Sequence, residues 1–165
     1  VDLLERRRDE LNELGVRVHF MGDVNDDRVP DVLRQRIRDA EELTKANERM
    51  HMVFAFNYGG RVELVEAVRK IAAAAPDPSS ITEDTVREHL YLPQMPDPDL
   101  VIRTSGEQRT SNFLLWEAAY SEYVFTPVLW PDFDRNELAR CIDEYQERDR
   151  RFGGAVDESL TDIGG

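Results

Sequence analysis

The spacing of apolar residues changes along the chain between a pattern typical of strands and one typical of helices. Short runs rich in β-branched and aromatic residues predict strands over residues 16–21, 51–56, 100–104 and 123–130. Apolar residues three and four positions apart predict helices over residues 2–14, from Pro30, after Gly60, over 81–90, over 111–121 and from Asp134. Strands that alternate with helices predict an α/β fold with a mainly parallel twisted sheet flanked by helices.

Each predicted helix has one apolar face that we expect to be buried. These faces carry Leu33, Ile37, Ala40 and Leu43, then Val62, Val65, Val68 and Ala72, and finally Leu138, Ile142 and Tyr145. The last helix opens with Asp134 and has Glu137 three residues later, the pattern of a capping box. Residues 155–165 have little apolar surface to bury, so we expect a mobile tail.

A polar or glycine-rich segment follows each predicted strand. These segments are "GDVND", "NYGGR", "RTSGEQR" and "WPDFD". In parallel α/β sheets, ligands bind beyond the carboxyl ends of the strands, so we expect all four segments to share one rim that holds the site.

Composition excludes several classes of function. The chain has 165 residues, enough for one domain with a hydrophobic core, and a formal net charge of −13. Nucleic-acid binding is excluded because it requires a broad basic surface. No apolar run is long enough for a membrane span, and a single cysteine suits a reducing cytoplasm.

The bend after the third predicted strand has the chemistry of an anion site. Arg103 ends the strand, Gly106 permits a tight turn, and Arg109, Thr110 and Ser111 precede a predicted helix. A helix N-terminus and two guanidinium groups suit a phosphate or diphosphate. In the alternative interpretation Ser111 only caps the helix and the arginines pair with nearby glutamates, Glu107 and Glu117. Spacing alone leaves both interpretations open.

Glu122 follows that predicted helix. A lone glutamate is most often a solvated surface group, but beside a diphosphate it could bind Mg²⁺, which prefers one or two carboxylates plus phosphate oxygens. The three histidines and Cys141 lack metal-ligand spacing, so we expect them in the core or at the surface. Phe54 and Phe56 could line an apolar tunnel, and we favour a core position for both.

The ordered motifs "DLVIRTSGEQRTSNFLLWEAAYSEYVF", "LWPDF" and "RDRRFGG", with "HFMGD" and "FNYGGR" upstream, resemble the carboxyl-terminal signature of cis-prenyltransferases, the undecaprenyl or decaprenyl diphosphate synthase family. The resemblance covers about residues 1–154. It implies an enzyme that condenses isopentenyl diphosphate with an allylic, farnesyl-type diphosphate and needs Mg²⁺. The product would be a polyprenyl diphosphate, a lipid carrier for cell-wall synthesis.

The resemblance also implies roles for individual residues. Arg103, Arg109 and Ser111 would hold the isopentenyl diphosphate, with Thr110 contributing backbone, and Glu122 would bind or support Mg²⁺. The terminal "RRFGG" motif would complete the active site of a second copy, which implies a homodimer. We expect a cytoplasmic protein, loosely attached to the membrane at most.

Two departures from the family pattern stand out. Gln108 stands where some members have a histidine near the metal, and we do not assign this neutral amide to metal binding. The family's amino-terminal half, with its Asp-Gly-Asn-Gly-Arg loop, has no counterpart here. We therefore expect residues 1–154 to be the carboxyl-terminal portion of a single synthase domain, inactive alone. A non-catalytic accessory subunit of a cis-prenyltransferase complex is the alternative.

Overall fold

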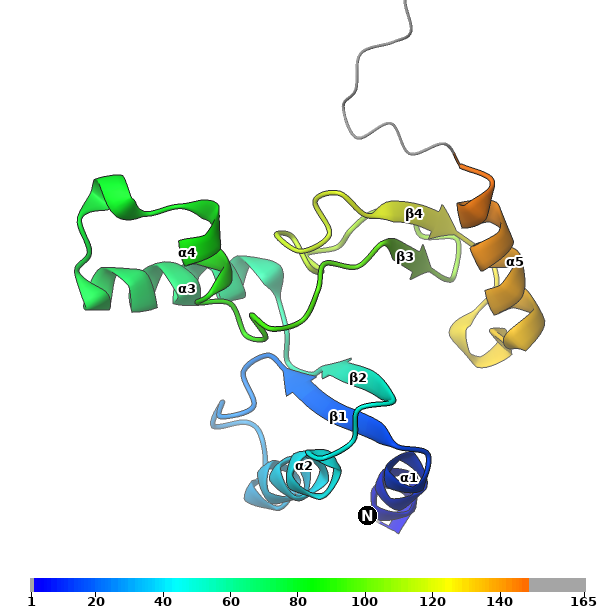
Figure 1. Ribbon diagram of the computed structural model, residues 1–165. Helices are drawn as coiled ribbons and strands as arrows, with labels where there is room; N and C mark the ends of the chain where they lie inside the picture. Colours follow the sequence, from blue (N-terminus) through cyan, green and yellow to red (C-terminus); the bar gives the residue numbers. More distant parts are fainter. Residues whose placement is uncertain (1, 149–165) are drawn as a thin grey trace, which may run out of the picture. The chain divides into compact units, whose positions relative to one another are not determined.

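The computed structural model describes residues 2–148. In chain order its elements are α1 (Asp2–Glu13), β1 (Val16–Met21), α2 (Asp31–Thr44), β2 (Met50–Ala55), α3 (Gly60–Ala74), α4 (Glu83–Arg87), β3 (Leu100–Arg103), β4 (Glu122–Phe125) and α5 (Arg135–Gln146) (Figure 1). The chain divides into two compact units. The first comprises Val1–Pro98 and Arg109–Tyr120, and the second comprises Asp99–Gln108 and Ser121–Gly165.

Each unit contains one pair of parallel strands. β1 pairs with β2 from Val16 opposite Met50 to Met21 opposite Ala55, and β3 pairs with β4 from Leu100 opposite Glu122. The predicted α/β class with parallel strands is thereby confirmed. Within residues 2–148 the strands form two two-stranded sheets, so a rim shared by all four strands stays a prediction.

Two helices build the core of the first unit. α1 and α2 contact each other and β1, and they lie side by side along one face of the β1–β2 pair (Figure 1). Ile37 and Ala40 of α2 are buried there, as are Val16 and Val18 of β1, whereas Leu43 is 43% exposed. The sequence therefore predicted the centre of the α2 face correctly and extended it one turn too far.

The outer edge of β1 is closed by side chains. The Val18 amide donates to Thr44 Oγ1 at 3.0 Å, and the Phe20 amide donates to Glu41 Oε1 at 2.9 Å. The Asn47 side chain donates to the Val16 carbonyl at 2.9 Å. These contacts satisfy three outward-facing backbone groups that an edge strand otherwise leaves unpaired.

The predicted buried face of α3 is wrong. Val62, Val65 and Val68 are 52%, 50% and 60% exposed, while the buried residues of the helix are Gly60, Glu63, Ala67 and Ile71. The inward face carries Glu63 instead, because residues outside the helix donate hydrogen bonds to its carboxylate. The Tyr58 hydroxyl donates to Glu63 Oε2 and the Tyr91 amide donates to Glu63 Oε1 at 3.0 Å, which allows a carboxylate to face inward.

The predicted helix over 111–121 is also wrong, because this segment consists of turns. Ser111, Asn112 and Leu114 have φ angles of 54°, 65° and 46°, in the left-handed region that a right-handed helix excludes. Ala118 still donates to the Leu114 carbonyl at 2.9 Å, but no regular helix develops. The helix N-terminus that we expected beside Arg109 is therefore absent.

The second unit packs α5 against β4. Val124, Thr126 and Cys141 are fully buried at this contact, whereas Leu138 and Ile142 are 41% and 38% exposed. The buried residue of α5 is thus Cys141, and the predicted stripe was displaced around the helix. Among residues 2–148, no helix combines the length and the apolar character that a bilayer span requires.

Candidate functional site

The two units divide the predicted site residues between them. Arg103 is the last residue of β3 and Glu122 is the first residue of β4, both in the second unit. Arg109, Thr110 and Ser111 are exposed residues of the first unit. The structure therefore confirms that Arg103 ends a strand, and the convergence of the two arginines on one anion stays a prediction.

The bend after Arg103 has the tight turn that Gly106 predicted. Ser105 and Gly106 have φ angles of 68° and 70°. The Ser105 amide donates to the Val128 carbonyl at 2.8 Å, and the Gly106 amide donates to the Thr126 carbonyl at 2.9 Å. These hydrogen bonds extend the β3–β4 pairing past the end of β3, so the bend starts from a fixed backbone.

Arg103 forms the ion pair that the alternative interpretation predicted. Its Nη2 lies 3.2 Å from Glu107 Oε2, and the two side chains are 25% and 38% exposed. Partly exposed pairs of this kind contribute about 0–1 kcal/mol, whereas a bidentate arginine–phosphate contact is considerably stronger. Breaking this one ion pair would therefore cost little.

Asn112 is the functional candidate that the sequence analysis missed. Its backbone carbonyl accepts from the Gly60 amide at 2.8 Å, and its Oδ1 accepts from the Arg61 amide at 2.8 Å. These are the first amides of α3, which have no partner inside the helix. The available signal was the residue type, because asparagine tolerates a left-handed backbone and caps helices.

The "NYGG" segment shapes a turn, as we expected. Asn57 has a φ angle of 48°, and its side chain donates to the Asp23 carbonyl at 2.9 Å. A Cβ atom on Gly60 would lie 2.8 Å from Leu115 Cγ and 3.1 Å from the Leu115 amide nitrogen. Glycine is therefore required where α3 begins, because residues 112–115 pack directly against its backbone.

Glu122 already has an ionic partner. Arg148 Nη1 donates to Glu122 Oε2 at 2.9 Å, and Arg148 Nη2 donates to Glu144 Oε1 at 2.8 Å. Both contacts raise the pKa of Arg148. Glu122 therefore helps to attach the end of α5 to the start of β4.

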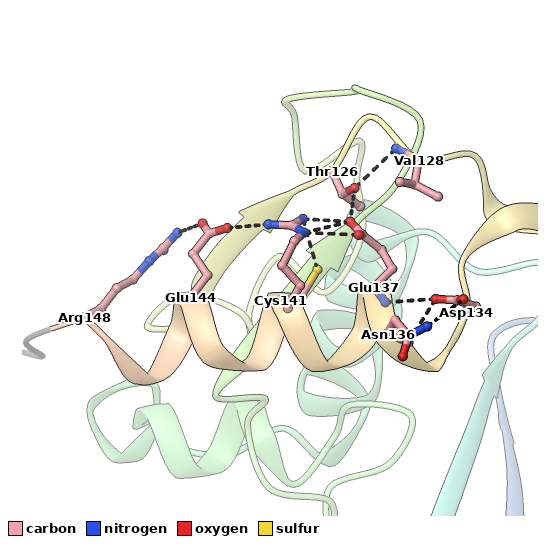
Figure 2. A network of polar contacts seen from close by, with 9 residues as sticks. Thr126, Val128, Asp134, Asn136, Glu137, Cys141, Glu144 and Arg148 are labelled. Atoms are coloured by element: carbon pink, nitrogen blue, oxygen red, sulfur yellow. Dashed lines mark hydrogen bonds and ion pairs between the residues drawn. The ribbon is translucent and has the colours of Figure 1, made fainter.

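Polar contacts continue from Arg148 along α5 (Figure 2). Arg140 bridges Glu144 and Glu137, and the buried Thr126 hydroxyl donates to Glu137 Oε1. The hydrogen bonds from Arg140 and Thr126 lower the pKa of Glu137 to about 2. Asp134 caps the helix as predicted, accepting from the Asn136 and Glu137 amides at 2.9 Å each, but the Glu137 side chain contacts Thr126 and Arg140 and does not complete the predicted capping box.

The described residues fit Mg²⁺ only in a limited way. Within residues 2–148 no group of three or more His, Cys, Asp or Glu side chains is placed to hold a metal ion. Glu122 could supply one carboxylate, with a bound diphosphate providing the other oxygens.

His19 is buried, and its ring stacks on that of His51 with the centroids 5.2 Å apart, in agreement with a core position.

Phe54 does not occupy the core position that we favoured. It is 42% exposed and stacks on Phe20 with the ring centroids 5.3 Å apart. Both rings line an apolar cavity of about 150 Å³, together with Leu11 and Val18. Phe54 thus contributes to an apolar cavity, and the proposed tunnel for a prenyl chain stays a prediction.

Known proteins resemble most of the chain. The undecaprenyl diphosphate synthase family model matches residues 1–153. Isoprenyl transferase 2 of Streptomyces avermitilis is 49% identical over 98% of this chain and 58% of its own length. Decaprenyl diphosphate synthase of Mycobacterium bovis is 48% identical over 93% of this chain and 53% of its own length.

A solved structure confirms the fold. Lavandulyl diphosphate synthase from Lavandula x intermedia, crystallised with dimethylallyl diphosphate, superposes with a TM-score of 0.86. It is 40% identical, and the match covers 92% of this chain and 67% of that protein. The chain thus spans a little over half the length of the two bacterial relatives. The chain belongs to the undecaprenyl diphosphate synthase family.

Proposed function

We propose that this chain is the carboxyl-terminal portion of a cis-prenyltransferase that condenses isopentenyl diphosphate with an allylic diphosphate. The observation that carries this proposal is the family match over residues 1–153, which includes every residue of the predicted diphosphate site. The relative crystallised with dimethylallyl diphosphate supports an allylic diphosphate as one substrate.

The chemistry of the site residues agrees with this reaction. The bond between the allylic carbon and its diphosphate breaks, a carbon–carbon bond to isopentenyl diphosphate forms, and a proton is lost from the new prenyl unit. Both substrates carry diphosphates, so the site must neutralise negative charge in a protein whose net charge is −13. Arg103, Arg109 and Ser111 supply two guanidinium groups and a hydroxyl for the isopentenyl diphosphate, and Thr110 supplies backbone between them.

Substitution of the two arginines in the full-length protein tests the proposal. Arg103→Ala and Arg109→Ala should each lower kcat/KM for isopentenyl diphosphate by roughly 10²–10³, because each removes a charged diphosphate contact. Arg38→Ala is the matched control, since that arginine contacts only Gln35 among the hydrogen bonds of its side chain within residues 2–148. Wild-type kinetics in both site variants would exclude these arginines from the site.

For Mg²⁺ we propose that Glu122 contributes one oxygen beside the bound diphosphate, after exchanging its contact with Arg148. A bound Mg²⁺ would neutralise diphosphate charge as the allylic bond breaks. Titration of the full-length protein with Mn²⁺, followed by electron paramagnetic resonance with diphosphate present, measures this binding without turnover. Glu122→Gln should weaken Mn²⁺ binding about tenfold or more, and an unchanged titration would exclude the role.

The accessory-subunit alternative makes a different prediction. A purely structural subunit would support prenyl transfer by a partner even without its own diphosphate site. Loss of turnover in Arg103→Ala with the fold retained therefore argues for the enzyme. The homodimer, the cell-wall carrier role of the product and loose membrane contact belong to this proposal. The predicted "RRFGG" contribution and the 155–165 tail lie outside the described residues.

A further inference from the structure

The segment that carries Arg109 and Ser111 has an unfavourable backbone. Ser111 and Asn112 are consecutive non-glycine residues with φ angles of 54° and 65°. Left-handed conformations cost free energy in such residues and persist only where surrounding contacts hold them. Something in the first unit must therefore stabilise this bend.

Asn112 makes the contacts that do so. Its backbone carbonyl and its Oδ1 accept from two successive amides at the start of α3, those of Gly60 and Arg61, at 2.8 Å each. A Cβ atom on Gly59 would lie 2.9 Å from Asn112 Nδ2, so the side chain also packs closely on the backbone before the helix. Backbone and side chain of one residue thus bind the bend to the rigid start of a 15-residue helix.

We propose that Asn112 is a positioning residue for isopentenyl diphosphate. By holding the left-handed bend against α3, it fixes the direction in which the neighbouring Ser111 and Arg109 leave the backbone. Asn112 itself need not touch the substrate, because both of these polar contacts are made with α3. This inference rests on the proposed function, in which Arg109 and Ser111 bind the diphosphate of that substrate.

The test compares two substitutions in the full-length protein. Asn112→Ala removes the Oδ1 acceptor, so the bend loses one of its two hydrogen bonds to α3 and Ser111 and Arg109 are held less firmly; the KM for isopentenyl diphosphate should rise about tenfold. The KM for the allylic diphosphate should change less than about twofold. Asn112→Asp keeps an acceptor at the same place, and its charge is favourable at a helix N-terminus, so it should restore the melting temperature. Because that charge also lies beside Ser111 and disfavours a diphosphate, the KM should recover only in part, to within about threefold.

Asn136→Ala is the matched control, because Asn136 lies near the start of α5 and its side chain contacts Asp134. The proposal is overturned if Asn112→Ala retains the wild-type KM for isopentenyl diphosphate. It is also overturned if Asn112→Ala raises the KM for both substrates and lowers the melting temperature, and Asn112→Asp reverses none of these changes. Absence of turnover in the wild-type protein would instead refute the proposed function and this inference with it.

Discussion

Replacing Thr126 by valine should measure how strongly the second unit depends on one buried hydroxyl. Thr126 is fully buried, donates to Glu137 and accepts from the Val128 amide at 3.2 Å. Valine has nearly the same shape but no hydroxyl, so both partners lose a hydrogen bond. Leaving both partners without their hydrogen bond lowers the free energy of unfolding by about 2–3 kcal/mol. Burial of the added methyl raises it by up to about 1 kcal/mol. The net destabilisation should be about 1–2 kcal/mol.

Thr126→Ser is the control that separates the hydroxyl from the methyl. Serine keeps both hydrogen bonds and loses one buried methyl, which costs about 1 kcal/mol. Because the Thr126 hydrogen bond helps to lower the pKa of Glu137, only the valine variant should change the acid sensitivity of the protein. Glu137 has a folded pKa below its unfolded value, so its contribution is present above the unfolded pKa and is lost as the pH falls toward about 2.

Urea denaturation followed by circular dichroism, repeated between about pH 7 and about pH 3, would measure the free energy of unfolding of each variant and its dependence on pH. We expect the valine variant to lose less stability than the wild type as the pH falls, because the folded pKa of Glu137 then lies closer to its unfolded value, while serine follows the wild-type profile. Parallel profiles for the two variants would refute the reasoning, because the hydroxyl would then have no measurable influence on Glu137.

Three further predictions concern single side chains. Gly60→Ala should destabilise the first unit by about 1–2 kcal/mol in urea denaturation, because a Cβ atom 2.8 Å from Leu115 Cγ outweighs the better helix propensity of alanine; greater stability would contradict this. Burial raises the pKa of Glu117, whose Oε2 is buried and has no hydrogen-bond partner within residues 2–148, and the charge of Glu63 adds to the effect. A group whose pKa is raised by folding stabilises the protein below its unfolded pKa and ceases to do so as the pH rises. Glu117→Gln should therefore stabilise the protein at about pH 7 and much less at about pH 4. Equal stabilisation at both pH values would argue against this. Burial also raises the pKa of the Cys141 thiol, so iodoacetamide should label it only after urea unfolds the second unit, and rapid labelling of the native protein would show that α5 opens.

The sequence predicted the features that depend on local spacing. Strands 16–21 and 100–104, the start of α2 beyond Pro30 and the Asp134 cap correspond to observed elements within a residue or two. It also placed Arg103 at the carboxyl end of its strand. Each of these features is determined by residues within one or two turns of the chain.

The failures occur where distant residues decide the structure. The valine face of α3 faces out because Tyr58 and Tyr91 satisfy the Glu63 carboxylate, and Tyr91 is 28 residues away in sequence. The apolar spacing after Ser111 suggested a helix, but the contact of Asn112 with α3 holds the segment in turns. Asn112 was missed for the same reason, because its partner Arg61 lies 51 residues earlier in the sequence.

The closed outer edge of β1 determines how the first sheet can grow. Thr44, Glu41 and Asn47 already satisfy the outward amides and carbonyl of β1, so another strand could pair there only after breaking those contacts. Among residues 2–148 no strand pairs with the other side of β2. A strand added to this sheet, whether from the same polypeptide or from another molecule, is therefore favoured next to β2, and edge-to-edge association of copies through β1 is disfavoured.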